Sequence, residues 1–102
     1  MSKSDQVIEF YVDKNILENS KYFEKDKKII LNRSFFHNPE EIILRSITQL
    51  IKRISWKKNY PRGKKVNSLI ESIKFSNKNV KLTLSGCIIE KISDSVIIYP
   101  EK

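Results

Sequence analysis

The chain has 102 residues, with twenty Lys and Arg against twelve Asp and Glu, and a formal net charge of +8 at pH 7. This length fits one domain. The core of that domain should be small, because a chain of this size buries only about 65% of its unfolded surface. A single cysteine, Cys87, excludes an internal disulfide, and we find neither a signal peptide nor an apolar run long enough to span a bilayer. We therefore expect a soluble, cytoplasmic protein that does not bind a membrane.

The distribution of charge is more informative than its total. Lys, Ile and Asn are abundant and Gly is scarce, which an AT-rich coding sequence produces without selection for basicity. The four arginines, Arg33, Arg45, Arg53 and Arg62, are therefore stronger evidence than the lysines. Residues 1–39 hold seven basic and six acidic side chains, whereas residues 40–102 hold thirteen and six. This asymmetry indicates a polyanionic partner for the second part of the chain.

The first part of the chain, residues 1–38, predicts a helix followed by a short extended arm. Apolar residues from Asp5 to Leu17 recur at a loose helical spacing, which predicts a helix over residues 5–17. Two short apolar segments, 21–24 and 28–31, then flank Lys25-Asp26-Lys27 and predict a hairpin or an extended arm. Neither segment is long enough to be stable alone.

Residues 39–75 predict a helical hairpin. Asn38-Pro39-Glu40-Glu41 supplies an N-cap, a Pro at the first helical position and carboxylates at the positive end of the dipole, so a helix is predicted over residues 39–55. Its apolar residues form one stripe: Ile43, Ile47, Leu50, Ile51 and Ile54. After the turn-forming Pro61-Arg62-Gly63, the stripe repeats and predicts an antiparallel helix over residues 64–75: Val66, Leu69, Ile70 and Ile73.

The connection from Lys52 to Lys65 carries seven basic residues and no acidic one. Lys and Arg neutralise phosphates, and the flat rings of Trp56 and Tyr60 suit stacking on unpaired bases, so this basic turn is typical of an RNA-binding surface. A solvated loop, with Trp56 as a lid on the core, is the alternative for the same residues. The candidate RNA-binding residues are Arg45, Lys52, Arg53, Trp56, Lys57, Lys58, Tyr60, Arg62, Lys64 and Lys65.

Residues 80–99 predict a small antiparallel sheet of two or three strands. Alternating residues from Val80 to Leu84 are followed by apolar runs at 87–92 and 96–99. Ser85-Gly86 fits either a tight hairpin turn or a bulge within one strand. The sequence thus predicts an α+β fold in a single domain, 1–102, with two to three helices followed by a C-terminal antiparallel sheet.

We expect no catalytic residue and no metal ligand. Cys87 lies in an apolar strand, where a cysteine behaves as a small buried hydrophobe. His37 is the one histidine, so no set of metal-binding side chains is present. Glu40 and Glu41 point to different helix faces and are better explained as helix-start carboxylates than as an acid/base pair.

Two motifs resemble the C-terminal region of bacterial tRNA(Ile)-lysidine synthetase, particularly the alphaproteobacterial type. Tyr60-Pro61-Arg62-Gly63-Lys64 is similar to the family's Tyr-Pro-Pro-Arg, and Thr83-Leu84-Ser85-Gly86-Cys87 is similar to its Thr-Leu-Gly-Gly-Cys, which precedes a final apolar strand. The second Pro is missing here, and Ser85 replaces the first Gly. The resemblance covers about residues 5–102, but its specific motifs cover only 60–63 and 83–87.

The resemblance implies tRNA recognition without catalysis. This family uses ATP to adenylate the wobble cytidine in the CAU anticodon of an isoleucine tRNA, and lysine then displaces AMP to give lysidine. That chemistry belongs to an N-terminal domain with a Ser-Gly-Gly-x-Asp-Ser loop. This chain cannot build such a loop, because its two glycines, Gly63 and Gly86, are far apart in the sequence. The implied partners are tRNA(Ile) with a CAU anticodon and a catalytic N-terminal domain or chain. ATP and lysine, with Mg²⁺, belong to that parent enzyme, and this chain is expected to bind no cofactor.

Two further classes of function remain open. The predicted helices are compatible with a stand-alone, helix-turn-helix-like nucleic-acid-binding module, although their connection is longer than the usual three or four residues. The other alternative is a protein-interaction domain whose charge reflects base composition alone. A preference for DNA over RNA would favour the first of these.

Overall fold

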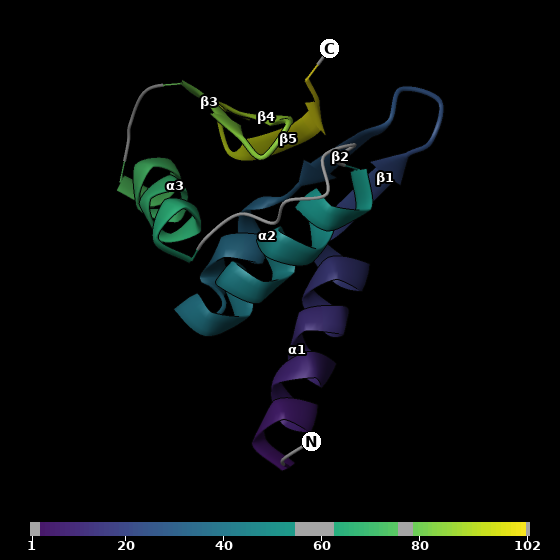
Figure 1. Cartoon of the computed structure of the whole chain (residues 1–102), viewed down its shortest axis with the longest axis vertical. Helices are drawn as coiled ribbons and strands as arrows, with labels where there is room; N and C mark the ends of the chain where they lie inside the picture. The colour runs from purple at the N-terminus through teal and green to yellow at the C-terminus, as the bar shows by residue number, and fades with distance from the viewer. Residues whose placement is uncertain (1–2, 55–62, 76–78, 102) are drawn as a thin grey trace.

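The computed structural model describes residues 3–54, 63–75 and 79–101. Within these residues the chain has the α+β fold that the sequence predicts, with three α-helices, a short 3-10 helix and a five-stranded sheet (Figure 1). The elements in chain order are α1 (Lys3–Asn19), β1 (Ser20–Phe23), β2 (Lys28–Leu31), η1 (Arg33–His37), α2 (Glu40–Ile54), α3 (Gly63–Phe75), β3 (Val80–Leu84), β4 (Cys87–Ile92) and β5 (Ser95–Pro100).

The sheet is larger than predicted, because the N-terminal hairpin joins it. Its strand order is β1-β2-β5-β4-β3, and each neighbouring pair is antiparallel. Ile29 pairs with Ile98 and Leu31 with Val96, and all four side chains are buried. This register places the buried apolar residues of β2 and β5 on one face, which stabilises the short strand β2 within the sheet.

The core lies between one face of the sheet and the helices. The predicted α3 stripe is buried throughout: Val66, Leu69, Ile70 and Ile73. The predicted α2 stripe is buried at Ile43, Ile47, Leu50 and Ile51, and its last residue, Ile54, is partly buried against the same cluster. They share one cluster with residues of the sheet and of η1, and Cys87 is fully buried in the same cluster, as expected. Figure 1 shows α2 and α3 on the same side of the sheet.

Helix α1 is attached through a buried polar contact as well as through the buried apolar side chain of Val12. Phe10 and Leu17 are 62% and 82% exposed, and Figure 1 shows α1 extending away from the sheet toward the N-terminus. Asn15, by contrast, is 2% exposed, and its Nδ2 donates to Ser46 Oγ at 3.2 Å and to the Phe35 carbonyl at 3.4 Å. One side chain thus ties α1 to η1 and α2.

Two local features refine the sequence prediction. Ser85 and Gly86 have φ values of 50° and 82° between the paired residues Leu84 and Cys87. Two left-handed residues in a two-residue loop form a type I′ hairpin turn, so Ser85-Gly86 is a turn and not a bulge. Helix α2 begins at Glu40. Asn38 is the C-cap residue of η1, and its Nδ2 donates to the Phe35 carbonyl at 3.3 Å.

Candidate nucleic-acid interface

The structure describes five of the ten candidate RNA-binding residues. Arg45, Lys52 and Arg53 lie on α2, and Lys64 and Lys65 lie in the first turn of α3. The remaining candidates fall outside the described residues, as does the centre of the basic turn: Trp56, Lys57, Lys58, Tyr60 and Arg62. In Figure 1 the last turn of α2 lies toward the β1–β2 hairpin, whereas α3 lies beside β3. The described candidates therefore form two groups.

The first group borders a groove of about 290 Å³ between α1 and α2. Both Arg45 and Lys52 line it, together with Glu9. Arg45 Nε also donates to Glu41 Oε1 at 2.7 Å, an ion pair one helical turn apart. Because Glu41 pairs with Arg45 and Glu9 lines the same groove, we expect Arg45 to contribute less to phosphate binding than the sequence predicts.

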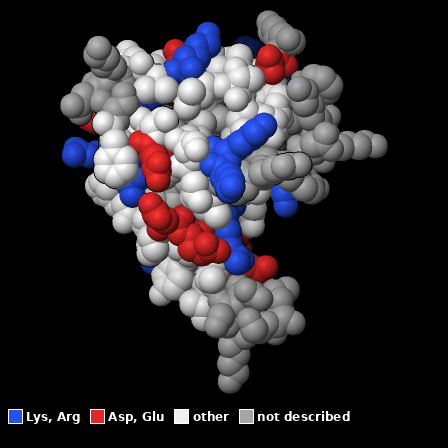
Figure 2. All heavy atoms as spheres, turned by 60° about the vertical axis from the view of Figure 1, so that its left-hand side comes forward, with Lys and Arg blue, Asp and Glu red and all other residues white. Residues whose placement is uncertain are grey.

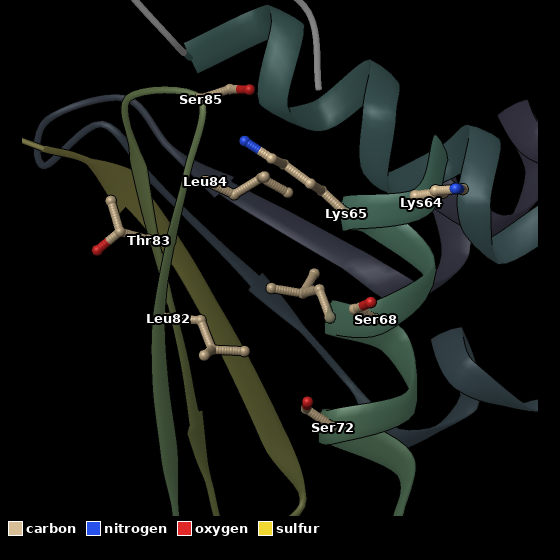
Figure 3. Close-up of a pocket in the computed structure, with 9 residues that line it drawn as sticks. Lys64, Lys65, Ser68, Ser72, Leu82, Thr83, Leu84 and Ser85 are labelled. Carbon is tan, nitrogen blue, oxygen red and sulfur yellow. The ribbon is translucent and has the colours of Figure 1, made fainter. Parts of the chain in front are cut away.

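The second group borders a larger groove, about 400 Å³, between α3 and the β3–β4 turn (Figure 3). The Lys65 side chain reaches across it toward Ser85, whereas Lys64 points away from β3. Leu82 and Leu84 project from β3 toward the helix, and Ser68 and Ser72 supply hydroxyls from α3. This groove, the α3–β3 groove, thus combines an ammonium group with hydroxyl donors over an apolar floor, which suits a phosphate group with its attached sugar.

Sequence reasoning did not identify the serines of this groove. Lys64, Ser68 and Ser72 are spaced four residues apart, which places them along one side of α3. That spacing was a signal available in the sequence. The contribution of Ser85 could not be predicted from the sequence, because it depends on the close approach of the β3–β4 turn to α3.

The electrostatics of α3 favour an anion at its start. The first turn holds no acidic residue and carries Lys64 and Lys65 at the positive end of the helix dipole. A cation in this position opposes the dipole, whereas an anion there stabilises the helix by about 0.3–1 kcal/mol. A bound phosphate would therefore relieve an unfavourable arrangement that the free protein carries.

The second motif noted in the sequence lies at this groove, beside the residue that directly follows the first. Thr83, Leu84 and Ser85 begin the second motif and line the groove, as does Lys64, the residue after the specific part of the first motif, 60–63. The intervening helix α3 and strand β3 pack against each other, which brings together segments that are separate in the sequence. The second motif and the start of the helix that follows the first motif therefore contribute to one surface.

Charge on the rest of the described surface is mixed. Figure 2 shows a run of Asp and Glu side chains beside Lys and Arg side chains on one face. Eleven of the twelve acidic side chains are described, all but that of Asp5, together with fourteen of the twenty basic ones. The basic side chains outside the description are those of Lys3, Lys57, Lys58, Arg62, Lys78 and Lys102. The described part is therefore much closer to neutral than the whole chain.

The described residues offer neither a metal site nor a membrane span. Across residues 3–54, 63–75 and 79–101, no group of three or more His, Cys, Asp or Glu side chains could hold a metal ion. In the same ranges no helix is long and apolar enough to cross a membrane.

No family model, curated protein or solved structure matches the chain. The resemblance to lysidine synthetases therefore rests on the two motifs.

Proposed function

We propose that the chain is the tRNA-recognition portion of a tRNA(Ile)-lysidine synthetase, acts in the cytoplasm and is not catalytic alone. The observation that carries this proposal is the α3–β3 groove, where the second motif lies beside the start of α3 and Lys65 reaches toward Ser85. A catalytic N-terminal domain or chain would bind ATP, lysine and Mg²⁺. This chain would contribute affinity for tRNA(Ile) with a CAU anticodon.

In this proposal the α3–β3 groove holds the RNA backbone. Lys64 and Lys65 neutralise phosphates at the start of α3, while the hydroxyls of Ser68 and Ser72 hydrogen-bond phosphate or ribose oxygens. Lys52 and Arg53, both exposed on the last turn of α2, add charge on the approach to the basic turn. The aromatic residues of that turn keep the stacking role that the sequence predicts.

Binding of the purified chain to three nucleic acids across a salt series tests the proposal. The ligands are an isoleucine tRNA transcript with a CAU anticodon, an unrelated tRNA and a duplex DNA. We expect the CAU transcript to bind most tightly. A preference for duplex DNA would favour the helix-turn-helix-like alternative, and an absence of binding at low salt would favour the protein-interaction domain.

Charge variants locate the binding surface. Replacing Lys64 and Lys65 by Gln should reduce the slope of log affinity against log salt by about 1.4–1.8, which is 0.7–0.9 for each lost phosphate contact. The matched control replaces Lys14 and Lys25 by Gln; both are exposed and line none of the grooves at α1–α2, at α3–β3 or at the C-terminal end of α3. An equal reduction in the control would leave only a generic effect of net charge and refute the assignment.

A further inference from the structure

A second cationic groove lies at the other end of α3. It has a volume of about 360 Å³ and shares no lining residue with the α3–β3 groove. Four separate parts of the chain supply its walls: η1, the end of α3, β4 and the β4–β5 turn. The lining residues are Arg33, Phe36, His37, Ile73, Lys74, Lys91 and Asp94.

The charge of this groove is only partly compensated. Arg33, Lys74 and Lys91 line it together with one carboxylate, that of Asp94. Three cations and one anion leave a net positive lining even where Asp94 offsets one of the charges. The C-terminal end of α3 adds a partial negative charge of about 0.5, which together with Asp94 is still smaller than the three positive charges. Concave surfaces lined mainly by one sign of charge concentrate the electrostatic potential, so the groove attracts anions.

One of these cations is held in a fixed position. Lys91 Nζ donates to the carbonyl of Ile73 at 2.7 Å, near the C-terminal end of α3. The bond places the ammonium group in a groove whose walls include the buried side chains of Ile73 and Phe36. A charge that is already positioned loses less conformational entropy when it binds a ligand than one on a mobile side chain.

We propose that this groove binds a phosphate group of the RNA backbone, with the Arg33 guanidinium and the Lys74 and Lys91 ammonium groups as its ligands. A guanidinium presents paired N–H donors that match phosphate oxygens, and the ammonium groups add point charges. This inference rests on the proposed function, because it takes its phosphate from the same RNA.

Helix α3 explains why a polymer suits both grooves. Ten residues separate Lys64 from Lys74, which corresponds to about 15 Å along a helix axis. One phosphate cannot reach both ends of that span. Several consecutive nucleotides can, so a nucleic acid that follows α3 would contact both grooves at once.

The test compares two double variants with the control described above. Replacing Arg33 and Lys74 by Gln should by itself reduce the slope of log affinity against log salt for the CAU transcript by about 1.4–1.8. This reduction is separate from the one caused by replacing Lys64 and Lys65. Arg33 and Lys74 are both exposed, so the thermal midpoint should fall only slightly, through the loss of the favourable Lys74 charge at the C-terminal end of α3. As a readout independent of RNA, inorganic phosphate should cause saturable amide shifts at Lys91 and Asp94 in the wild type but not in this variant.

The outcomes separate the two proposals. If only the Lys64 and Lys65 variant reduces the slope, the second groove does not bind RNA and the proposed function stands. If only the Arg33 and Lys74 variant does, the second groove stands and the α3–β3 assignment fails. Phosphate-dependent shifts without an effect on tRNA binding would overturn the RNA assignment, and an absence of tRNA binding would overturn both proposals.

Discussion

Replacing Asn15 by Leu tests the polar contact that holds α1 to the rest of the domain. Asn15 Nδ2 donates to Ser46 and Phe35, and its Oδ1 accepts from Asn19 at 2.9 Å and from Asn38 at 3.0 Å. At a net value of about 0.5–1.5 kcal/mol for each hydrogen bond, and with two long bonds among the four, the expected loss is about 2–4 kcal/mol. This is a large share of the stability of a small domain.

Urea unfolding measures the effect of this substitution. With a slope of about 1.5 kcal/mol per molar, a loss of about 3 kcal/mol lowers the urea midpoint by about 2 M. The control makes the same chemical change at Asn67, which is exposed on α3 and should alter the free energy of unfolding by less than about 0.5 kcal/mol. If the Asn15 variant lies within about 1 kcal/mol of the wild type, the network does not stabilise the fold and the reasoning is wrong.

Three further predictions concern the turn, the sheet and α3. Gly86→Ala should destabilise by about 1–2 kcal/mol, because φ is 82° there, and an unchanged thermal midpoint would contradict this. The hydrogen bond from Tyr99 to Glu90 raises the pKa of Tyr99 above its usual value. The contribution of this bond to the stability of the fold is therefore lost as pH rises through that raised pKa. Glu90→Gln should lower the pKa of Tyr99, which an ultraviolet titration measures. Replacing Lys64 and Lys65 by Gln should slightly stabilise the free protein in thermal unfolding, and a loss of stability would instead give both lysines a structural role.

The sequence predicted best the elements whose pattern is local. The stripes of α2 and α3 are continuous at helical spacing, and every residue from Val66 to Ile73 on the α3 stripe is buried. The pairing of β2 with β5 was missed because it joins residues nearly seventy positions apart, and no local pattern specifies a partner for a four-residue strand. Phe35 and Phe36 were missed because adjacent aromatic residues in a 3-10 helix follow neither period.

The candidate sites show the same limit. The sequence identified Lys64 and Lys65 from local charge density, but it did not identify Arg33, Lys74 and Lys91 as a group, since each lies on a different element. The loose helical pattern around Asn15 did not predict its burial, which depends on contacts outside α1. Residues whose role depends on several elements require the tertiary structure.

The two ends of α3 differ in how charge relates to stability. At its C-terminal end, Lys91 donates to the Ile73 carbonyl and Lys74 lies in the last turn. Both cations therefore interact favourably with the negative end of the helix dipole and stabilise the free fold. At its N-terminal end, Lys64 and Lys65 oppose the dipole and gain nothing from it. Folding alone can account for the first pair but not for the second. The lysines at the start of α3 are therefore the stronger evidence that this surface binds an anion.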